Sequence, residues 1–160
     1  MKSLVVYASQ TGNTEKLARV VLEVLPGDKV LCPLDKAESS IDDYDLVAVG
    51  FWLQAGKPVA PAAEFLATIK PGQKVFLFAT HGAAVDSGHA RAAMDNARAL
   101  VPAGSEVVGL FHCQGEVNPA FLEKVSARPD PPPWIKEAPL AAGHPDEADL
   151  AELKKTVAGF

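Results

Sequence analysis

The loop of residues 9–14 carries the residue types in this sequence that are best suited to chemistry, Ser9-Gln10-Thr11-Gly12-Asn13-Thr14. It follows a short apolar run and precedes a helical pattern, so unpaired N–H groups and the positive end of the helix dipole face it. A phosphate dianion binds at such a position without lysine or arginine. Hydroxyl groups and the Asn13 amide add donors, and Gly12 allows a positive φ angle or a close approach to the anion. The spacing therefore predicts a phosphate-binding loop.

Two commoner phosphate motifs do not match this loop. The Walker pattern Gly-x-x-x-x-Gly-Lys-Ser/Thr is absent, and the loop has a single glycine where the dinucleotide-binding fingerprint needs several. The structural alternative is an ordinary helix cap that happens to be rich in hydroxyl groups.

The elements that position the loop are short apolar runs alternating with helical patterns. Runs typical of buried strands occupy residues 4–8, 29–32, 46–51, 75–79 and 107–113. Apolar residues at helical spacing occupy residues 17–25, 62–69, 90–101 and 150–157, and the last of these helices is expected to begin near residues 144–147. The segment between the second and third strands is too short and polar for a full helix. This alternation predicts an α/β protein with a parallel sheet covered on both faces.

The chain is expected to form a single domain over residues 1–160, because two separate cores in 160 residues would both be very small. Residues 118–127 fit a short helix. Residues 129–145 contain six of the thirteen prolines, which predicts an extended, proline-rich strap on the surface before the last helix.

Composition excludes several classes of protein. The net charge is −5, which argues against a protein that binds the nucleic-acid backbone. The apolar run at residues 4–8 is too short for a signal peptide or a membrane span. Cys32 and Cys113 stand far apart, so neither a disulfide framework nor a zinc site is expected and no metal site is predicted. A cytoplasmic location is the expectation.

The phosphate loop matches the flavodoxin motif Ser/Thr-x-Thr-Gly-Asn-Thr at the place where flavodoxins carry it. The order of strands and helices over residues 3–113 is similar as well, so the chain resembles the flavodoxin family. The resemblance implies a flavodoxin-like three-layer sandwich with a five-stranded parallel sheet of order 2-1-3-4-5. It also implies FMN as the cofactor, bound at the carboxyl ends of the strands.

In a flavodoxin-like fold, the loops after the third and fourth strands flank the flavin ring. In the first loop Trp52 is the preferred stacking residue and Phe51 is the other aromatic candidate, with Leu53 and Gly56 as further contacts. In the second loop the candidates are the small or polar residues Thr80, His81 and Gly82.

This second loop departs from many flavodoxins, which place a tyrosine there as a second stacking ring. His81 or Trp134 can substitute for that tyrosine, or one face of the flavin is open to a substrate or partner. His89 is expected to cap a helix or to lie on the surface. Cys113, at the end of the fifth strand, is expected to be a buried structural residue, and no catalytic residue is predicted.

The expected function is an FMN-binding flavoprotein that shuttles electrons between redox protein partners. The alternative is an FMN-dependent reductase of a quinone or another small acceptor, so the sequence leaves open whether the chain is an enzyme in its own right. A flavin-free interaction module is a third possibility. A signalling receiver domain of the same topology is excluded, because it needs an aspartate at the end of the third strand, where Phe51 and Trp52 stand.

Overall fold

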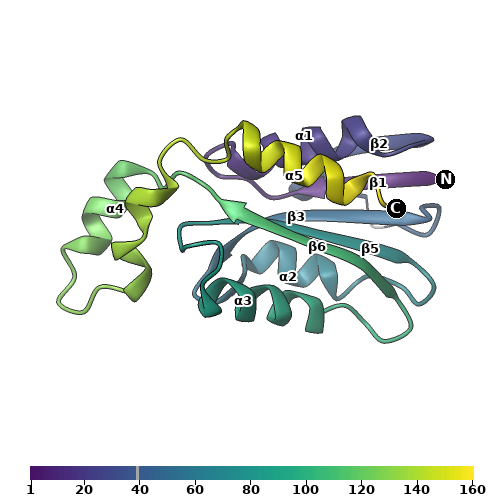
Figure 1. Cartoon of the computed structure of the whole chain (residues 1–160). Helices are drawn as coiled ribbons and strands as arrows, with labels where there is room; N and C mark the ends of the chain where they lie inside the picture. Colours follow the sequence, from purple (N-terminus) through teal and green to yellow (C-terminus); the bar gives the residue numbers. More distant parts are fainter. Residues whose placement is uncertain (39) are drawn as a thin grey trace.

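The computed structural model describes residues 1–38 and 40–160, and its centre is a sheet of five parallel strands (Figure 1). These strands are β1 (Lys2–Tyr7), β2 (Asp28–Pro33), β3 (Leu46–Gln54), β5 (Lys74–His81) and β6 (Glu106–Gln114). They lie in the order β2-β1-β3-β5-β6. Counted over the parallel strands alone, this is the predicted order 2-1-3-4-5, which is confirmed.

A sixth strand was not predicted. β4 (Lys57–Pro58) pairs antiparallel with the end of β3, so the segment expected to be a loop after the third strand is a tight hairpin. The turn between the two strands is made by Ala55 and Gly56, with φ angles of 52° and 76°. Two consecutive positive φ angles are the signature of the type I′ turn that joins hairpin strands, although alanine is an unusual residue in it.

Helices cover both faces of the sheet (Figure 1). α1 (Asn13–Val24) and α5 (Glu147–Val157) lie on one face, and α2 (Ala60–Leu66) and α3 (Gly88–Ala99) lie on the other. Most of the apolar stripe predicted for the first helix is buried, with Leu17 and Val21 fully enclosed and Val24 partly exposed. Two apolar layers result, one on each face, as expected for a parallel sheet.

The segment between β2 and β3 contains one 3-10 turn, η1 (Leu34–Lys36), among its described residues, in keeping with the expectation that it forms no full helix. α5 starts at a capping box, in which Asp146 and Asp149 each accept a hydrogen bond from the backbone N–H of the other. α3 starts at Ser87, whose hydroxyl accepts from the N–H of Ala90. His89 is therefore not the cap of this helix.

Residues 116–143 form a lobe that projects from the end of the sheet (Figure 1). It contains α4 (Pro119–Ser126), which confirms the short helix expected there, and the 3-10 helices η2 (Pro133–Lys136) and η3 (Ala138–Ala141). The prediction that residues 129–145 form an extended strap is wrong, because this segment contains η2 and η3. Proline lies in the first turn of both η2 and η3, because its fixed φ angle suits the start of a helix as well as an extended segment.

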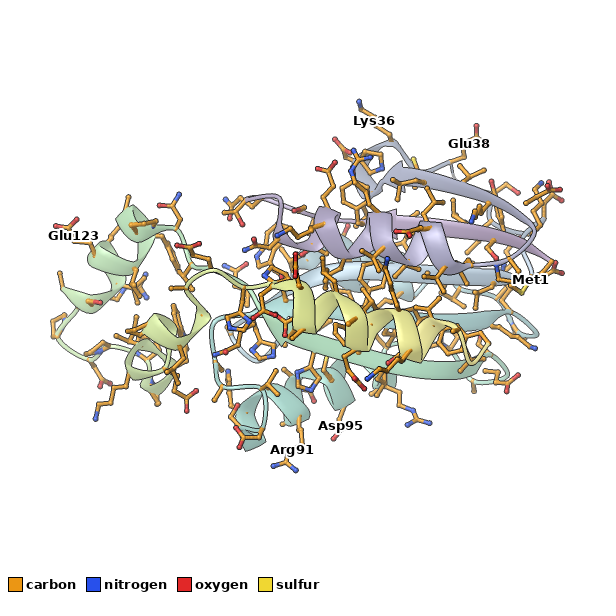
Figure 2. All side chains as sticks on the ribbon, turned by 45° about the horizontal axis from the view of Figure 1, so that its top comes forward. Met1, Lys36, Glu38, Arg91, Asp95 and Glu123 are labelled. Atoms are coloured by element: carbon orange, nitrogen blue, oxygen red, sulfur yellow. The ribbon has the colours of Figure 1, made fainter. Side chains whose placement is uncertain are left out.

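Charged side chains project outward around this framework (Figure 2). Arg91 and Asp95 point away from α3, Glu123 points away from α4, and Lys36 and Glu38 lie on the surface after β2. None of the helices described in residues 1–38 and 40–160 has the length and apolar character that crossing a bilayer requires.

Candidate functional site at the carboxyl ends of the strands

A cavity of about 490 Å³ opens at the carboxyl ends of the parallel strands. Its walls come from the loop of residues 9–14, the β3–β4 hairpin, the end of β5 with the loop after it, the start of α3, and the lobe. The cavity lies beside the point where the strand order reverses, because β1 has β2 on one side and β3 on the other. Ligands of open α/β sheets bind at this switch point, and the volume falls within the range of about 300–1,000 Å³ usual for small-molecule sites.

The start of α1 forms one end of the cavity. Gly12 is the N-cap of the helix, with a φ angle of 91°, and no side chain in the described chain caps the first turn. The Gly12 N–H instead donates to the hydroxyl oxygen of Ser9, 3.1 Å away. The first amides of the helix are thus left for an external acceptor, which is the arrangement that binds anions.

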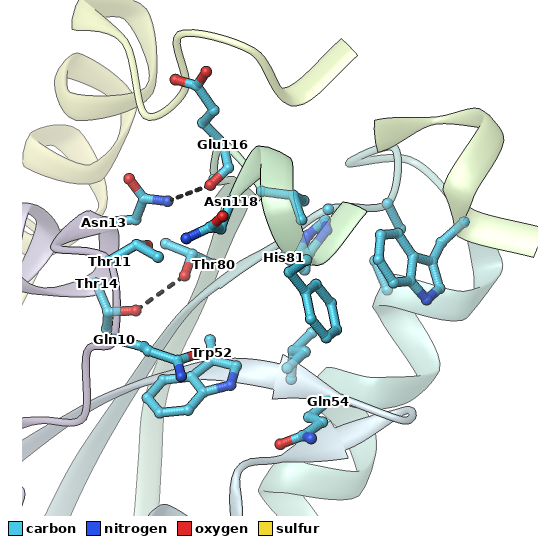
Figure 3. A pocket seen from close by; sticks show the side chains of 18 of the residues that line it. Gln10, Thr11, Asn13, Thr14, Trp52, Gln54, Thr80, His81, Glu116 and Asn118 are labelled. Carbon is cyan, nitrogen blue, oxygen red and sulfur yellow. Dashed lines mark hydrogen bonds between the residues drawn. The ribbon is translucent and has the colours of Figure 1, made fainter. Parts of the chain in front are cut away.

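Two of the predicted donors in this loop have protein partners (Figure 3). The hydroxyl groups of Thr14 and Thr80 form a buried hydrogen bond of 2.9 Å, and Nδ2 of Asn13 donates to the backbone oxygen of Glu116 at 3.0 Å. Gln10 and Thr11 also line the cavity. The hydrogen bonds of Thr14 and Asn13 connect the loop to β5 and to the first residue of the lobe.

The β3–β4 hairpin forms the second wall. Trp52, Leu53 and Gly56 all line the cavity, whereas Phe51 is fully buried in the core. Phe51 is thus wrong as a candidate for contact with a ligand, because it belongs to the fully buried part of β3, and the partly exposed end of the strand begins at Trp52. The hairpin is held in place by the Val59 N–H, which donates to the Trp52 carbonyl at 3.1 Å, and by the Asn96 amide, which donates to the Gly56 carbonyl at 2.9 Å.

The end of β5 supplies Thr80, His81 and Gly82, and all three line the cavity. His81 is buried, and its Nε2 lies 2.9 Å from Nδ1 of His112 on β6, so one of these two nitrogens donates to the other. Burial and the neighbouring His112 lower the pKa of His81 to about 4. The pKa of His112 is lowered as well, by burial and by Arg91. Both rings are therefore neutral at pH 7.

The second ring nitrogen of His81 is enclosed as well. Its Nδ1 is buried and has no hydrogen-bond partner within residues 1–38 and 40–160. A buried polar atom without a partner costs free energy, and such atoms in native proteins are commonly satisfied by water or a ligand. Because this atom is enclosed by the protein itself and the backbone of Ala83 lies beside the ring, it is a buried atom of the cavity wall and not a contact for a ligand.

The lobe forms the remaining wall and supplies residues that the sequence alone did not suggest. Phe121 of α4, with 48% of its surface exposed, lines the cavity together with Asn118. Trp134 of η2 also lines it, and a Cβ added at Gly82 would lie 3.4 Å from its ring. Trp134, named as one substitute for the missing tyrosine, is therefore in a position to contact a ligand. His89, expected to be a surface or capping residue, lines the cavity too.

Two other groups with possible chemistry have structural explanations. Cys113 is 2% exposed, and burial raises the pKa of its thiol, so it is not a thiolate. Side chains of His144, Asp146 and Asp149 lie close together, but the two carboxylates form the capping box of α5 and His144 bonds to Asp149.

A comparison with family models decides the affiliation of the chain. The model described as the flavodoxin domain matches residues 4–158, which is nearly the whole sequence. The chain belongs to the flavodoxin domain family. The flavodoxin-like fold expected from the phosphate loop is thereby confirmed.

Individual relatives of this flavodoxin-domain chain are distant in sequence. The flavodoxin-like domain-containing protein BilS of Clostridioides difficile (strain CD3) is 28% identical over 162 residues, covering 95% of this chain and 92% of BilS. A flavodoxin of Streptococcus pneumonia TIGR4 superposes with a TM-score of 0.65 at 18% identity, covering 98% of this chain and 95% of that one. The azoreductase AzrA gives 0.64 at 15% identity, with 100% of both chains covered. These two structures support the fold alone.

Proposed function

We propose that the protein binds FMN and transfers electrons between redox protein partners in a reducing cytoplasm. One observation carries the proposal: a single cavity joins the uncapped start of α1 to a set of aromatic side chains. FMN has a phosphate at one end and a flat ring at the other, so its two ends match the two ends of this cavity. The free thiols of Cys32 and Cys113 accord with a reducing compartment.

The residues of the loop would hold the phosphate of FMN. The first amides of α1 would donate to it, and the hydroxyl groups of Ser9 and Thr11 would add two donors beside Gly12. No lysine or arginine lines the cavity within the described residues, so the negative charge would be held by the helix dipole and neutral donors.

The ring end of the cavity would enclose the flavin between the hairpin and the lobe. Trp52 would stack on one face, and Trp134 and Phe121 lie on the lobe's side of the cavity. When bound, FMN supplies the redox chemistry by accepting and releasing electrons. Neutral His81, hydrogen-bonded to His112, would form part of the wall without adding positive charge to the site.

An absorbance spectrum tests the cofactor. The purified protein is incubated with FMN, separated from free flavin and examined for a bound flavin spectrum, and the released cofactor is identified by mass. One FMN per chain is the expected result. Release of FAD, or no uptake of FMN in a titration, contradicts the proposal.

The alternative is an FMN-dependent reductase of a quinone or another small acceptor. One observation favours it: the partly exposed ring of Phe121 lines the cavity and offers an apolar surface to a small acceptor. Oxidation of NADH or NADPH by the FMN-loaded protein separates the two functions. A carrier oxidises these donors slowly without a partner protein, whereas a reductase oxidises them rapidly when the acceptor is present.

A further inference from the structure

Asn13 stands in the phosphate loop, but its side chain is turned toward the lobe. Its Nδ2 donates to the backbone oxygen of Glu116 at 3.0 Å (Figure 3). The same side chain packs on Gly115, where an added Cβ would lie 2.9 Å from Nδ2 and 3.1 Å from the Cβ of Thr80. A residue larger than glycine would push Asn13 away from this position. The side-chain amide of Asn13 is thus hydrogen-bonded to the chain at the point where it leaves β6 and enters the lobe.

This point is also where the lobe ends. The Glu116 N–H donates to the backbone oxygen of His144 at 2.8 Å, and the Gly143 N–H lies 3.3 Å from the Glu116 carboxylate. Lys16 of α1 donates from Nζ to the backbone oxygen of Pro145 at 3.0 Å. The connections of the lobe to β6 and to α5 are therefore paired with each other, and each is bonded to a side chain near the start of α1.

The far side of the lobe contacts the loop after β5. The ring of Trp134 lies against Gly82, and the Glu137 carboxylate accepts from the Ala84 N–H at 2.7 Å. The lobe thus touches the body of the protein at two places. One is next to the phosphate loop, and the other is next to the ring end of the cavity.

We propose that Asn13 is a positioning residue that fixes the root of the lobe, and through it the aromatic wall containing Trp134, rather than a ligand of the phosphate. The proposal rests on the proposed function in so far as the ligand is FMN. It assigns to Asn13 a role at the ring end of the cavity, although the residue belongs to the phosphate motif.

Comparing FMN with riboflavin, which lacks the phosphate, separates the two roles. Asn13→Ala is expected to weaken both ligands by the same factor, about 2- to 10-fold, the size usual for one hydrogen bond. Thr11→Ala, on the same loop, is expected to weaken FMN and leave riboflavin unchanged. Ser126→Ala removes a hydrogen bond inside α4 and should change neither affinity.

Hydrogen exchange of the flavin-free protein gives a readout that does not depend on the ligand. Asn13→Ala should increase amide exchange in residues 116–143 relative to β1, and Ser126→Ala should not. Loss of affinity for FMN alone would make Asn13 a phosphate ligand and overturn the proposal, as would unchanged exchange of the lobe. If the unaltered protein binds neither FMN nor riboflavin, the proposed function fails, and the exchange experiment still decides whether Asn13 holds the lobe.

Discussion

The hydroxyl groups of Thr14 and Thr80 meet in a buried hydrogen bond of 2.9 Å, which joins the first turn of α1 to the end of β5. This contact connects the phosphate loop to the strand that carries His81. The start of α1 and the end of β5 are thus joined directly, in addition to their connection through the sheet.

Replacing one member of this pair should be more damaging than replacing both. Thr80→Val leaves the Thr14 hydroxyl buried without a partner and should lower the free energy of unfolding by about 1–3 kcal/mol. Thr14→Val combined with Thr80→Val should recover much of that loss, because no polar atom is then left unpaired. Denaturant unfolding of the single and double variants measures this, and simple addition of the two losses would show that the bond is not the cause.

Gly12 should matter for FMN through its backbone conformation. Its φ angle is 91° and nothing lies within 4 Å of an added Cβ, so Gly12→Ala introduces backbone strain of about 1–2 kcal/mol without a clash. The strain falls on the loop that is proposed to hold the phosphate, so affinity for FMN should fall more than affinity for riboflavin.

Gly72 provides a matched control for this substitution. It has a φ angle of 90° and open space around an added Cβ, but it lies in a turn that does not line the cavity. Gly72→Ala should lower stability by a similar amount and leave FMN binding unchanged. Equal losses of FMN and riboflavin in Gly12→Ala would show that the loop does not hold the phosphate.

Trp52→Ala should weaken FMN binding by about 1–3 kcal/mol, through loss of apolar burial and of aromatic contact. Fluorescence of the bound flavin should rise, because a stacked indole quenches it. Trp134→Ala is the natural comparison, since Trp134 lines the same cavity from the lobe. Unchanged affinity and fluorescence in Trp52→Ala would assign Trp52 to packing against the core.

Acid should destabilise the flavin-free protein through His81. Burial and His112 lower the pKa of His81 to about 4, below its ordinary value of 6.5. The unfolded chain therefore binds a proton more readily than the folded one, and stability present above pH 6.5 is lost as the pH falls toward 4. The loss from this group is on the order of 3 kcal/mol. Unfolding measured at pH 7 and pH 4.5 should show it, and His81→Gln should reduce the difference. Equal pH dependence in both proteins would contradict the assignment.

The parts of the protein that could be predicted from sequence are those specified by local patterns. The buried strands and amphipathic helices follow from apolar spacing, and the position of residues 9–14 between a strand and a helix follows from the same pattern. Trp52 was identified because it stands at the end of a strand. In the case of Phe51 and Trp52, the core residue is the last fully buried residue of β3 and the cavity residue is the next one, and the sequence does not say at which residue the burial ends.

The remaining walls depend on contacts between distant segments. Phe121 and Trp134 reach the cavity because the lobe folds back against Gly82, and no local pattern reports that contact. The hairpin was missed for a different reason. Its turn contains Ala55 where a type I′ turn usually has asparagine or glycine, so the usual signal for a hairpin is absent.

The paired connections of the lobe have a consequence for how such a chain can diverge. Because Glu116 and His144 are hydrogen-bonded to each other, the lobe enters and leaves the body of the protein at one place, like an insertion in a surface loop. The sheet closes beneath it without using its residues, and insertions at such sites are tolerated at little thermodynamic cost. The length and sequence of the lobe can therefore change while the strands and the phosphate loop stay as they are. A protein built this way can acquire a new partner or acceptor by replacing one exchangeable segment.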